Sequence, residues 1–447
     1  MTTPAAKYAA AKKRSKYLVT ADFISEFEFP FDQFQIDACH AVESGHGVLV
    51  AAPTGAGKTV VGEFAAYLAL RNGKKCFYTT PIKALSNQKF QEFVARFGEE
   101  RVGLLTGDTN INSEADILVM TTEVLRNMLY ANSNTLTNLG SVVMDEVHYL
   151  ADKFRGAVWE EVLIHLMESV QVISLSATVS NAEEFGEWLG EVRGQTDVIL
   201  SEHRPIPLYQ HVLINSSLID LFSQPGKINP EILALEREAM RKVRIPRNRR
   251  EQWSAQESRL SRAEIMEKLN RENLLPAITF IFSRMGCDAA VKQCLTAGLK
   301  LTNTEERAEI LATASRYTAN LPEEDLEVLG YREWITALER GIAAHHAGLL
   351  PSFKNAVEDL FQRGLVKAVF ATETLALGIN MPARTVVLEK LTKWNGEAHV
   401  PITPGEYTQL TGRAGRRGID IEGNAVCLLY TSPSPRDRTR SRMPSSA

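Results

Sequence analysis

The sequence contains no uninterrupted apolar stretch of about eighteen residues, the length that a membrane-spanning helix needs. Residues 1–20 carry several lysines but no apolar core of a secretory signal, which favours a cytoplasmic protein without a membrane partner. The five cysteines are widely spread and form no Cys-x-x-Cys pair, which argues against a disulfide framework or a zinc site. The formal net charge is only −4, so any polyanionic partner must be bound by a local cleft.

The chain of 447 residues is long enough for two or three domains, and 44% hydrophobic with 23% charged residues is ordinary for globular proteins. Short β-rich runs alternate with helical patterns over residues 22–205 and again over 276–429. This alternation predicts an α/β protein with two domains in tandem, each with a parallel sheet covered on both faces. Residues 206–275 break the rhythm and contain the arginine-rich run 241–250, which we interpret as a charged linker or insertion.

Both ends of the sequence differ from the rest. Residues 1–21 are basic, and we expect them to form a mobile tail. Residues 430–447 are mainly Ser, Pro and Arg with almost nothing to bury, which predicts disorder. Because the composition changes directly after a predicted strand, we interpret this end as non-native and the chain as incomplete at its C-terminus; the alternative is a regulatory basic tail.

A glycine-containing loop, residues 52–59, follows a predicted buried strand and opens a predicted helix. In that context glycines let backbone N–H groups face phosphate oxygens, and the helix N-terminus adds a favourable dipole. Lys58 can reach the β- and γ-phosphates of ATP, and the Thr59 hydroxyl can ligate Mg²⁺. Ala52 replaces the first glycine of the general pattern. The loop predicts an ATP site formed by Pro53, Thr54, Gly55, Ala56, Gly57, Lys58 and Thr59.

Two acids, Asp145 and Glu146, end another predicted buried strand. An unpaired carboxylate is costly in a strand core, but active sites of open α/β sheets lie at the carboxyl ends of the strands. There Asp145 can hold Mg²⁺, and Glu146 can orient or deprotonate the attacking water. An exposed acidic turn explains either residue alone but explains the pair poorly.

A third motif, residues 409–418, places Arg413 and Arg416 three residues apart between glycines. This spacing would bring both arginines to one side of a helix turn. An arginine supplied across an interface can stabilise charge on a transferring phosphoryl group. The alternatives are a solvated basic loop and a contact with a nucleic-acid phosphate.

Taken together, these motifs resemble those of superfamily 2 helicases of the DExH-box type. The resemblance covers about residues 25–430, and its motifs occur in a fixed order. The segments 345–351 and 376–382 are similar to the superkiller/exosome-helper branch of RNA helicases, and 278–287 to its bacterial, actinobacterial-type members. The matching segments are 52–59, 80–88, 121–123, 145–148, 176–178, 282–284, 372–380 and 409–418.

The resemblance implies two RecA-like domains that bind ATP and Mg²⁺ between them. It assigns Gln35 to the adenine, Gly378 to the nucleotide and Gln409 to the catalytic set. It assigns Ser176, Thr178 and His148 to coupling between hydrolysis and strand movement. The expected contacts with the nucleic-acid backbone are Pro81, Lys83, Asn87, Thr122, Ser283, Arg284 and Thr372. For Ser176 or Thr122 alone, a helix cap is the simpler interpretation.

The motifs favour an ATP-dependent helicase acting on single-stranded nucleic acid. The resemblance implies RNA rather than DNA, movement 3′→5′ and RNA-decay proteins as partners. A DNA helicase of the same superfamily fits the same motifs, because only contacts with the 2′-OH separate RNA from DNA. A phosphate-loop NTPase that acts as a switch, without nucleic acid, is the alternative from another class. A nucleotide-binding remnant that does not unwind is a further alternative.

Overall fold

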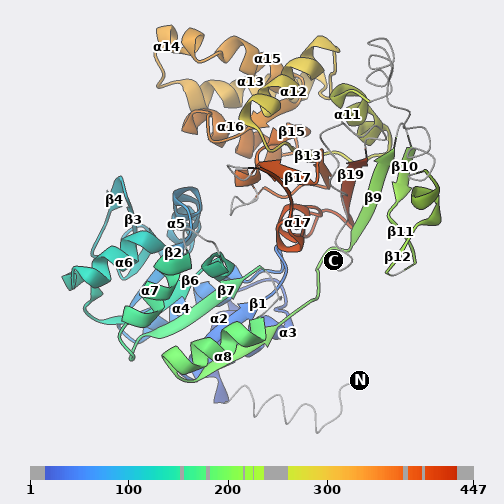
Figure 1. Cartoon of the computed structure of the whole chain (residues 1–447). Coiled ribbons are helices and arrows are strands. Elements are labelled where there is room, and N and C mark those ends of the chain that lie inside the picture. Colours follow the sequence, from blue (N-terminus) through green and yellow to red (C-terminus); the bar gives the residue numbers. More distant parts are fainter. Residues whose placement is uncertain are drawn as a thin grey trace. The chain divides into compact units, whose positions relative to one another are not determined.

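The computed structural model describes residues 16–151, 156–177, 182–214, 217–224, 226–235, 260–375, 381–394 and 398–429. The chain divides into two compact units, Met1–Arg204 and Pro205–Ala447 (Figure 1). The arginine run 241–250, the end segment 430–447, Thr178 and Gly378 lie outside the described residues.

The first unit is built on an eight-stranded sheet in the order β4-β3-β5-β2-β6-β7-β1-β8 (Figure 1). Neighbouring strands are parallel except β3 and β4, which form an antiparallel edge. The strands are β1 (Gly47–Ala51), β2 (Lys75–Thr80), β3 (Val102–Thr106), β4 (Thr109–Ile111), β5 (Ile117–Thr121), β6 (Leu139–Met144), β7 (Gln171–Ser176) and β8 (Thr196–Leu200).

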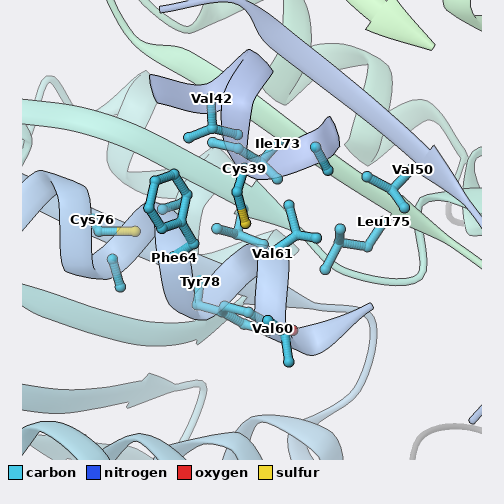
Figure 2. Close-up of a cluster of buried hydrophobic side chains, with 14 of the residues drawn as sticks. Cys39, Val42, Val50, Val60, Val61, Phe64, Cys76, Tyr78, Ile173 and Leu175 are labelled. Carbon is cyan, nitrogen blue, oxygen red and sulfur yellow. The ribbon is translucent and has the colours of Figure 1, made fainter. Parts of the chain in front are cut away.

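Both faces of this sheet are buried. Val48 and Val50 belong to one apolar cluster and Leu49 to another, because successive strand residues point to opposite faces. Figure 2 shows the first cluster, where Cys39 and Phe64 pack over the sheet. The helices are α2 (Leu18–Ser25), α3 (Gln33–Glu43), α4 (Thr59–Arg71), α5 (Lys83–Phe97), α6 (Thr122–Tyr130), α7 (Gly156–His165) and α8 (Ala182–Arg193), with 3₁₀ turns η1 (Asn134–Leu136) and η2 (Val147–Ala151).

The second unit has a seven-stranded sheet in the order β10-β9-β19-β16-β13-β15-β14. All neighbours are parallel except β9 and β10. The sheet strands are β9 (Leu208–Ile214), β10 (Ser217–Asp220), β13 (Ala277–Phe280), β14 (Ile342–His345), β15 (Ala368–Ala371), β16 (Thr385–Leu388) and β19 (Gly423–Leu429). The predicted α/β class with two mostly parallel sheets is therefore confirmed.

Helices and two small hairpins complete the second unit. The hairpins pair β11 (Phe222–Gln224) with β12 (Lys227–Ile228) and β17 (Thr392–Trp394) with β18 (His399–Pro401). The helices are α11 (Arg262–Arg271), α12 (Arg284–Thr296), α13 (Thr304–Thr318), α14 (Glu323–Val328), α15 (Tyr331–Glu339), α16 (Pro351–Gln362) and α17 (Pro404–Thr411), with the 3₁₀ turn η3 (Glu373–Leu375).

Two segments differ in structure from what their composition suggests. Helix α2 begins at Leu18, inside the predicted basic tail, because Thr20 and Phe23 are buried. The predicted linker 206–275 supplies β9, which pairs with β19 along its whole length. Its second half supplies α11, whose Ile265 and Met266 enter the core of the second unit. The high overall charge of these segments made their short apolar stretches hard to recognise in the sequence. Such stretches are nevertheless long enough to bury one face of a strand or helix.

Candidate active site

The loop 52–59 connects β1 to α4, as its sequence predicts. Gly55 and Gly57 adopt φ values of +82° and +88°, a conformation that other residues rarely tolerate. The Lys58 ammonium donates to the carbonyl oxygens of Ala52 at 2.6 Å and Pro53 at 3.0 Å. Ala52 itself is fully buried, and its N–H donates to the Ser176 carbonyl at the end of β7. The loop is thus held at its entry by a neighbouring strand end.

Gln35 lies beneath this loop and is almost fully buried. Its side-chain N–H donates to the carbonyl of Gly57 at 2.9 Å, and its oxygen accepts from the N–H of Asp32 at 2.8 Å. The amide therefore ties the start of α3 to the glycine loop. Its predicted role at the adenine stays a prediction.

Asp145 directly follows β6 and is buried. The Tyr78 hydroxyl donates to Asp145 Oδ2 at 2.7 Å, and the N–H of Glu146 donates to Oδ1 at 3.0 Å. The pKa of Asp145 is raised to about 6: burial is the largest cause and the Glu146 carboxylate adds to it, whereas Lys89, Tyr78 and Lys58 lower the pKa. The positive charges of Lys58 and Lys89 favour the ionised form of Asp145, the form that can hold a cation.

Glu146 adopts a φ of +55°, a left-handed conformation that is uncommon outside glycine. Its Oε2 atom is buried and lies 3.4 Å from His148 Nδ1. Burial lowers the pKa of His148 and outweighs the Glu146 carboxylate, which would raise it. The neutral form of His148 is therefore favoured at this position.

Lys89 is a member of this site that the sequence interpretation missed. Its ammonium donates to Thr59 Oγ1 at 3.1 Å and to Glu92 at 2.7 Å, and the residue is only 7% exposed. The sequence could have indicated this role, because Lys89 shares the buried face of α5 with Leu85, Ser86 and Phe93. A lysine at such a position needs a buried partner.

The predicted nucleic-acid residues of the first unit divide into exposed and buried ones. Lys83 and Asn87 are exposed one turn apart on α5, and Lys83 forms an ion pair with Asp108. Pro81 is buried, and the buried Thr122 hydroxyl donates to the Thr80 carbonyl at 3.3 Å. Of these side chains, only the exposed ones are accessible to a nucleic-acid strand. The assignment of these residues to nucleic-acid binding stays a prediction.

The second unit holds the remaining predicted contacts. Ser283 is the N-cap of α12 and accepts from the N–H of Gly286, and the next residue, Arg284, is exposed. The buried Thr372 hydroxyl lies 2.9 Å from that of Thr374, just after β15. Ser176 in the first unit ends β7 and is buried. A helix cap was an alternative for all of these residues, and it is observed for Ser283. Ser176 instead ends a strand, and Thr122 is the first residue of α6, after the N-cap Thr121.

Two neighbouring histidines of the second unit have carboxylate partners. His345 Nε2 lies 2.8 Å from Glu358 Oε1, and His346 Nε2 lies 2.9 Å from Asp288 Oδ1. The N–H of Gly348 donates to His346 Nδ1. Among the described residues, no cluster of three or more metal-ligating side chains gathers here or elsewhere.

The arginine block follows α17, which carries the half-buried Gln409. Helix α17 ends at Thr411, so Arg413 and Arg416 do not share the predicted helix turn. Arg413 is 7% exposed, and its carbonyl accepts from the N–H of Ala383 at 2.9 Å. Arg416 donates from Nε and Nη2 to the carboxylate of Asp420, at 2.8 and 2.9 Å.

Comparison with known proteins identifies two domains. The model of the DEAD/DEAH box helicase family matches residues 32–185, and that of the helicase conserved C-terminal domain matches 290–418. The chain is 59% identical to the probable helicase HelY of Mycobacterium leprae over 92% of its own length and 46% of that protein. It is 42% identical to a chloroplastic DExH-box ATP-dependent RNA helicase of Arabidopsis thaliana, over 91% of this chain and 38% of the relative.

A further relative is Superkiller complex protein 2 of Homo sapiens, 42% identical over 90% of this chain and 33% of that protein. The chain therefore spans half or less of the length of these relatives. Two matching helicase domains on two parallel sheets define the core of a superfamily 2 helicase. The chain belongs to the DExH-box, superkiller type of that superfamily, which confirms the resemblance seen in the sequence.

Among the described residues, no helix has the length and apolar character that crossing a bilayer requires.

Proposed function

We propose that this chain forms the motor core of an ATP-dependent RNA helicase that moves 3′→5′ along a single strand. The observation that carries the proposal is the grouping of the Lys58 loop and the Asp145–Glu146 pair in one unit. They follow β1 and β6, which are parallel and separated only by β7. Their carboxyl ends therefore lie along one edge of the sheet, where α/β enzymes place their active sites.

The residues at this edge suit a magnesium nucleotide. Thr59 supplies a hydroxyl and Asp145 a carboxylate, the hard oxygen ligands that Mg²⁺ prefers. The glycine loop and the start of α4 supply N–H groups for phosphates, and Lys58 supplies a positive charge. Bound Mg²⁺ would neutralise charge on the phosphates and stabilise the transferring group.

The side chains of this chain would then act as follows. Lys58 would exchange the carbonyls of Ala52 and Pro53 for phosphate oxygens. Glu146 would hold the attacking water and accept its proton, with His148 beside it as a neutral partner. Arg413 and Arg416 of the second unit would stabilise charge on the γ-phosphoryl group in the closed state, and Gln409 would belong to the same set.

The choice of RNA rests on the family. A relative named as an RNA helicase is 42% identical to this chain. Exposed Lys83, Asn87 and Arg284 can contact phosphates of either nucleic acid, so binding should be sequence-tolerant and weakened by salt. As part of this proposal, we expect the chain to act in the cytoplasm and to have RNA-decay proteins as partners.

The test is the rate of ATP hydrolysis by the chain with no polynucleotide, with single-stranded RNA and with DNA of the same sequence. We expect stimulation by RNA that exceeds stimulation by DNA. The Lys58→Ala variant serves as the control for contaminating ATPases. Stronger stimulation by DNA would indicate a DNA helicase, and a rate that neither polynucleotide changes would favour a nucleotide switch. A strand-displacement assay with a 3′ or a 5′ overhang then tests the direction.

A further inference from the structure

The segment after α17 closes on itself around one ion pair. Arg416 donates from Nε to Asp420 Oδ2 at 2.8 Å and from Nη2 to Oδ1 at 2.9 Å. The backbone N–H of Arg416 also donates to Oδ2 at 2.9 Å, and the N–H of Asp420 returns a bond to the Arg416 carbonyl at 2.9 Å. The Asp420 side chain is 4% exposed and that of Arg416 18%. This is a desolvated, bidentate ion pair, unlike the solvent-exposed ion pairs common on protein surfaces.

The surroundings of Asp420 invert the usual arrangement of polar and apolar residues. Ile419 is 66% exposed and Ile421 91% exposed, while the charged residue between them points inward. Burial would raise the pKa of Asp420, but hydrogen bonds from Arg416 outweigh it and lower the pKa, so the carboxylate keeps its charge. A loop that exposes two isoleucines to bury one aspartate is shaped by the ion pair.

The pairing also leaves a defined part of the guanidinium available. A guanidinium carries five N–H groups in a rigid plane, and the pair uses the edge formed by Nε and Nη2. The opposite edge, with Nη1 and the outer hydrogen of Nη2, points away from Asp420. An arginine side chain has several rotatable bonds, and fixing its plane beforehand removes much of the entropy lost on contact with an anion.

We propose that Asp420 is a positioning residue that holds Arg416 by one edge, so that the opposite edge is presented to the transferring phosphoryl group. The inference rests on the proposed function, in which Arg416 acts on that group. Asp420 itself touches neither nucleotide nor nucleic acid; it acts through Arg416.

The decisive variant is Asp420→Asn. The amide oxygen can still accept from the backbone N–H of Arg416, but the amide NH₂ cannot accept from the guanidinium. We expect the affinity for ATP to stay within about twofold, while the RNA-stimulated turnover falls by about ten- to a hundredfold, the scale of a small misplacement of a catalytic group. Asp420→Glu keeps the charge on a longer stem and should recover part of the loss.

A binding measurement separates positioning from a general loss of activity. The probe is ADP with aluminium fluoride, which imitates the transferring phosphoryl group. We expect Asp420→Asn to weaken binding of this pair relative to ADP alone by a factor similar to the loss of turnover. Glu267→Gln is the matched control, because it breaks the Arg271–Glu267 ion pair four residues apart on α11, outside the site.

A double variant of Arg416 and Asp420 tests whether the role of Asp420 is purely structural. In an Arg416→Ala background, Asp420→Asn should change turnover by less than about twofold, because the interaction is already absent. Equal losses in both backgrounds, or a loss matched by a fall in melting temperature, would overturn the proposal. Wild-type turnover in Asp420→Asn would overturn it too, while leaving the proposed function intact. Absence of Lys58-dependent hydrolysis in the unmodified chain would instead refute the proposed function.

Discussion

Replacing Tyr78 by phenylalanine removes one hydroxyl and leaves the ring in place. That hydroxyl donates to Asp145 Oδ2 at 2.7 Å in a fully buried position, while the ring packs edge-on against Phe93 at 5.1 Å between centroids. Phenylalanine keeps the ring contact. The variant therefore isolates a single hydrogen bond to the carboxylate expected to hold Mg²⁺.

The magnitude follows from the charge of the acceptor. A hydrogen bond to a charged group contributes about 1.5–3 kcal/mol, and one pH unit of pKa corresponds to about 1.4 kcal/mol. Burial and Glu146 already raise the pKa of Asp145. Losing the Tyr78 bond, which favours the carboxylate, should raise this pKa by a further one to two pH units, roughly. The carboxylate is then lost at a higher pH as the solution is acidified.

The assay is the affinity for a fluorescent ATP analogue, with Mg²⁺ and with EDTA, between pH 5.5 and 9. Because Mg²⁺ needs the ionised carboxylate, the Mg²⁺-dependent part of the affinity should fall toward acid in the unmodified chain. In Tyr78→Phe the same fall should begin about one to two pH units higher. Tyr67→Phe is the control, because it also removes one hydroxyl, and that hydroxyl accepts from Arg71 Nη1 at 3.4 Å in an exposed position. Superimposable pH profiles would refute the role of the Tyr78–Asp145 bond.

Three further outcomes are expected. Lys58→Ala should abolish RNA-stimulated ATP hydrolysis, and retained turnover would mean that the loop has been misinterpreted. Glu146→Gln should keep Mg²⁺–ATP binding and slow hydrolysis by about a hundredfold or more, whereas loss of binding would give Glu146 a different role. Because burial raises the pKa of every thiol, the folded chain should react with a disulfide reagent at pH 8 far more slowly than the chain in guanidinium, and rapid labelling of one cysteine would contradict its burial. The thiols are those of Cys39, Cys76, Cys287, Cys294 and Cys427.

The parts of the fold that the sequence predicted are those with strong local signals. The run 47–52 is apolar on both alternating faces, and it forms β1, buried between helices. The glycine loop and the acids after β6 were singled out as candidate site residues because both depart from what a buried strand requires. Lys89 and the Tyr78–Asp145 bond were not found, because they depend on contacts across 30 and 67 residues of sequence. The position of Lys89 on the buried face of α5 indicates that it needs a partner, but local patterns do not say which residue that partner is.

The arginine block shows where spacing alone misleads. Three-residue spacing of Arg413 and Arg416 suggested one helix face, but Gly412 caps α17 and Gly415 adopts a φ of +87°. A Cβ at Gly415 would come within 2.5 Å of the Ile206 side chain, so the close approach also requires glycine. The two glycines were visible in the sequence and signal the end of a helix. Once the helix ends, nothing in the backbone fixes the Arg416 side chain, and that task passes to a carboxylate four residues later.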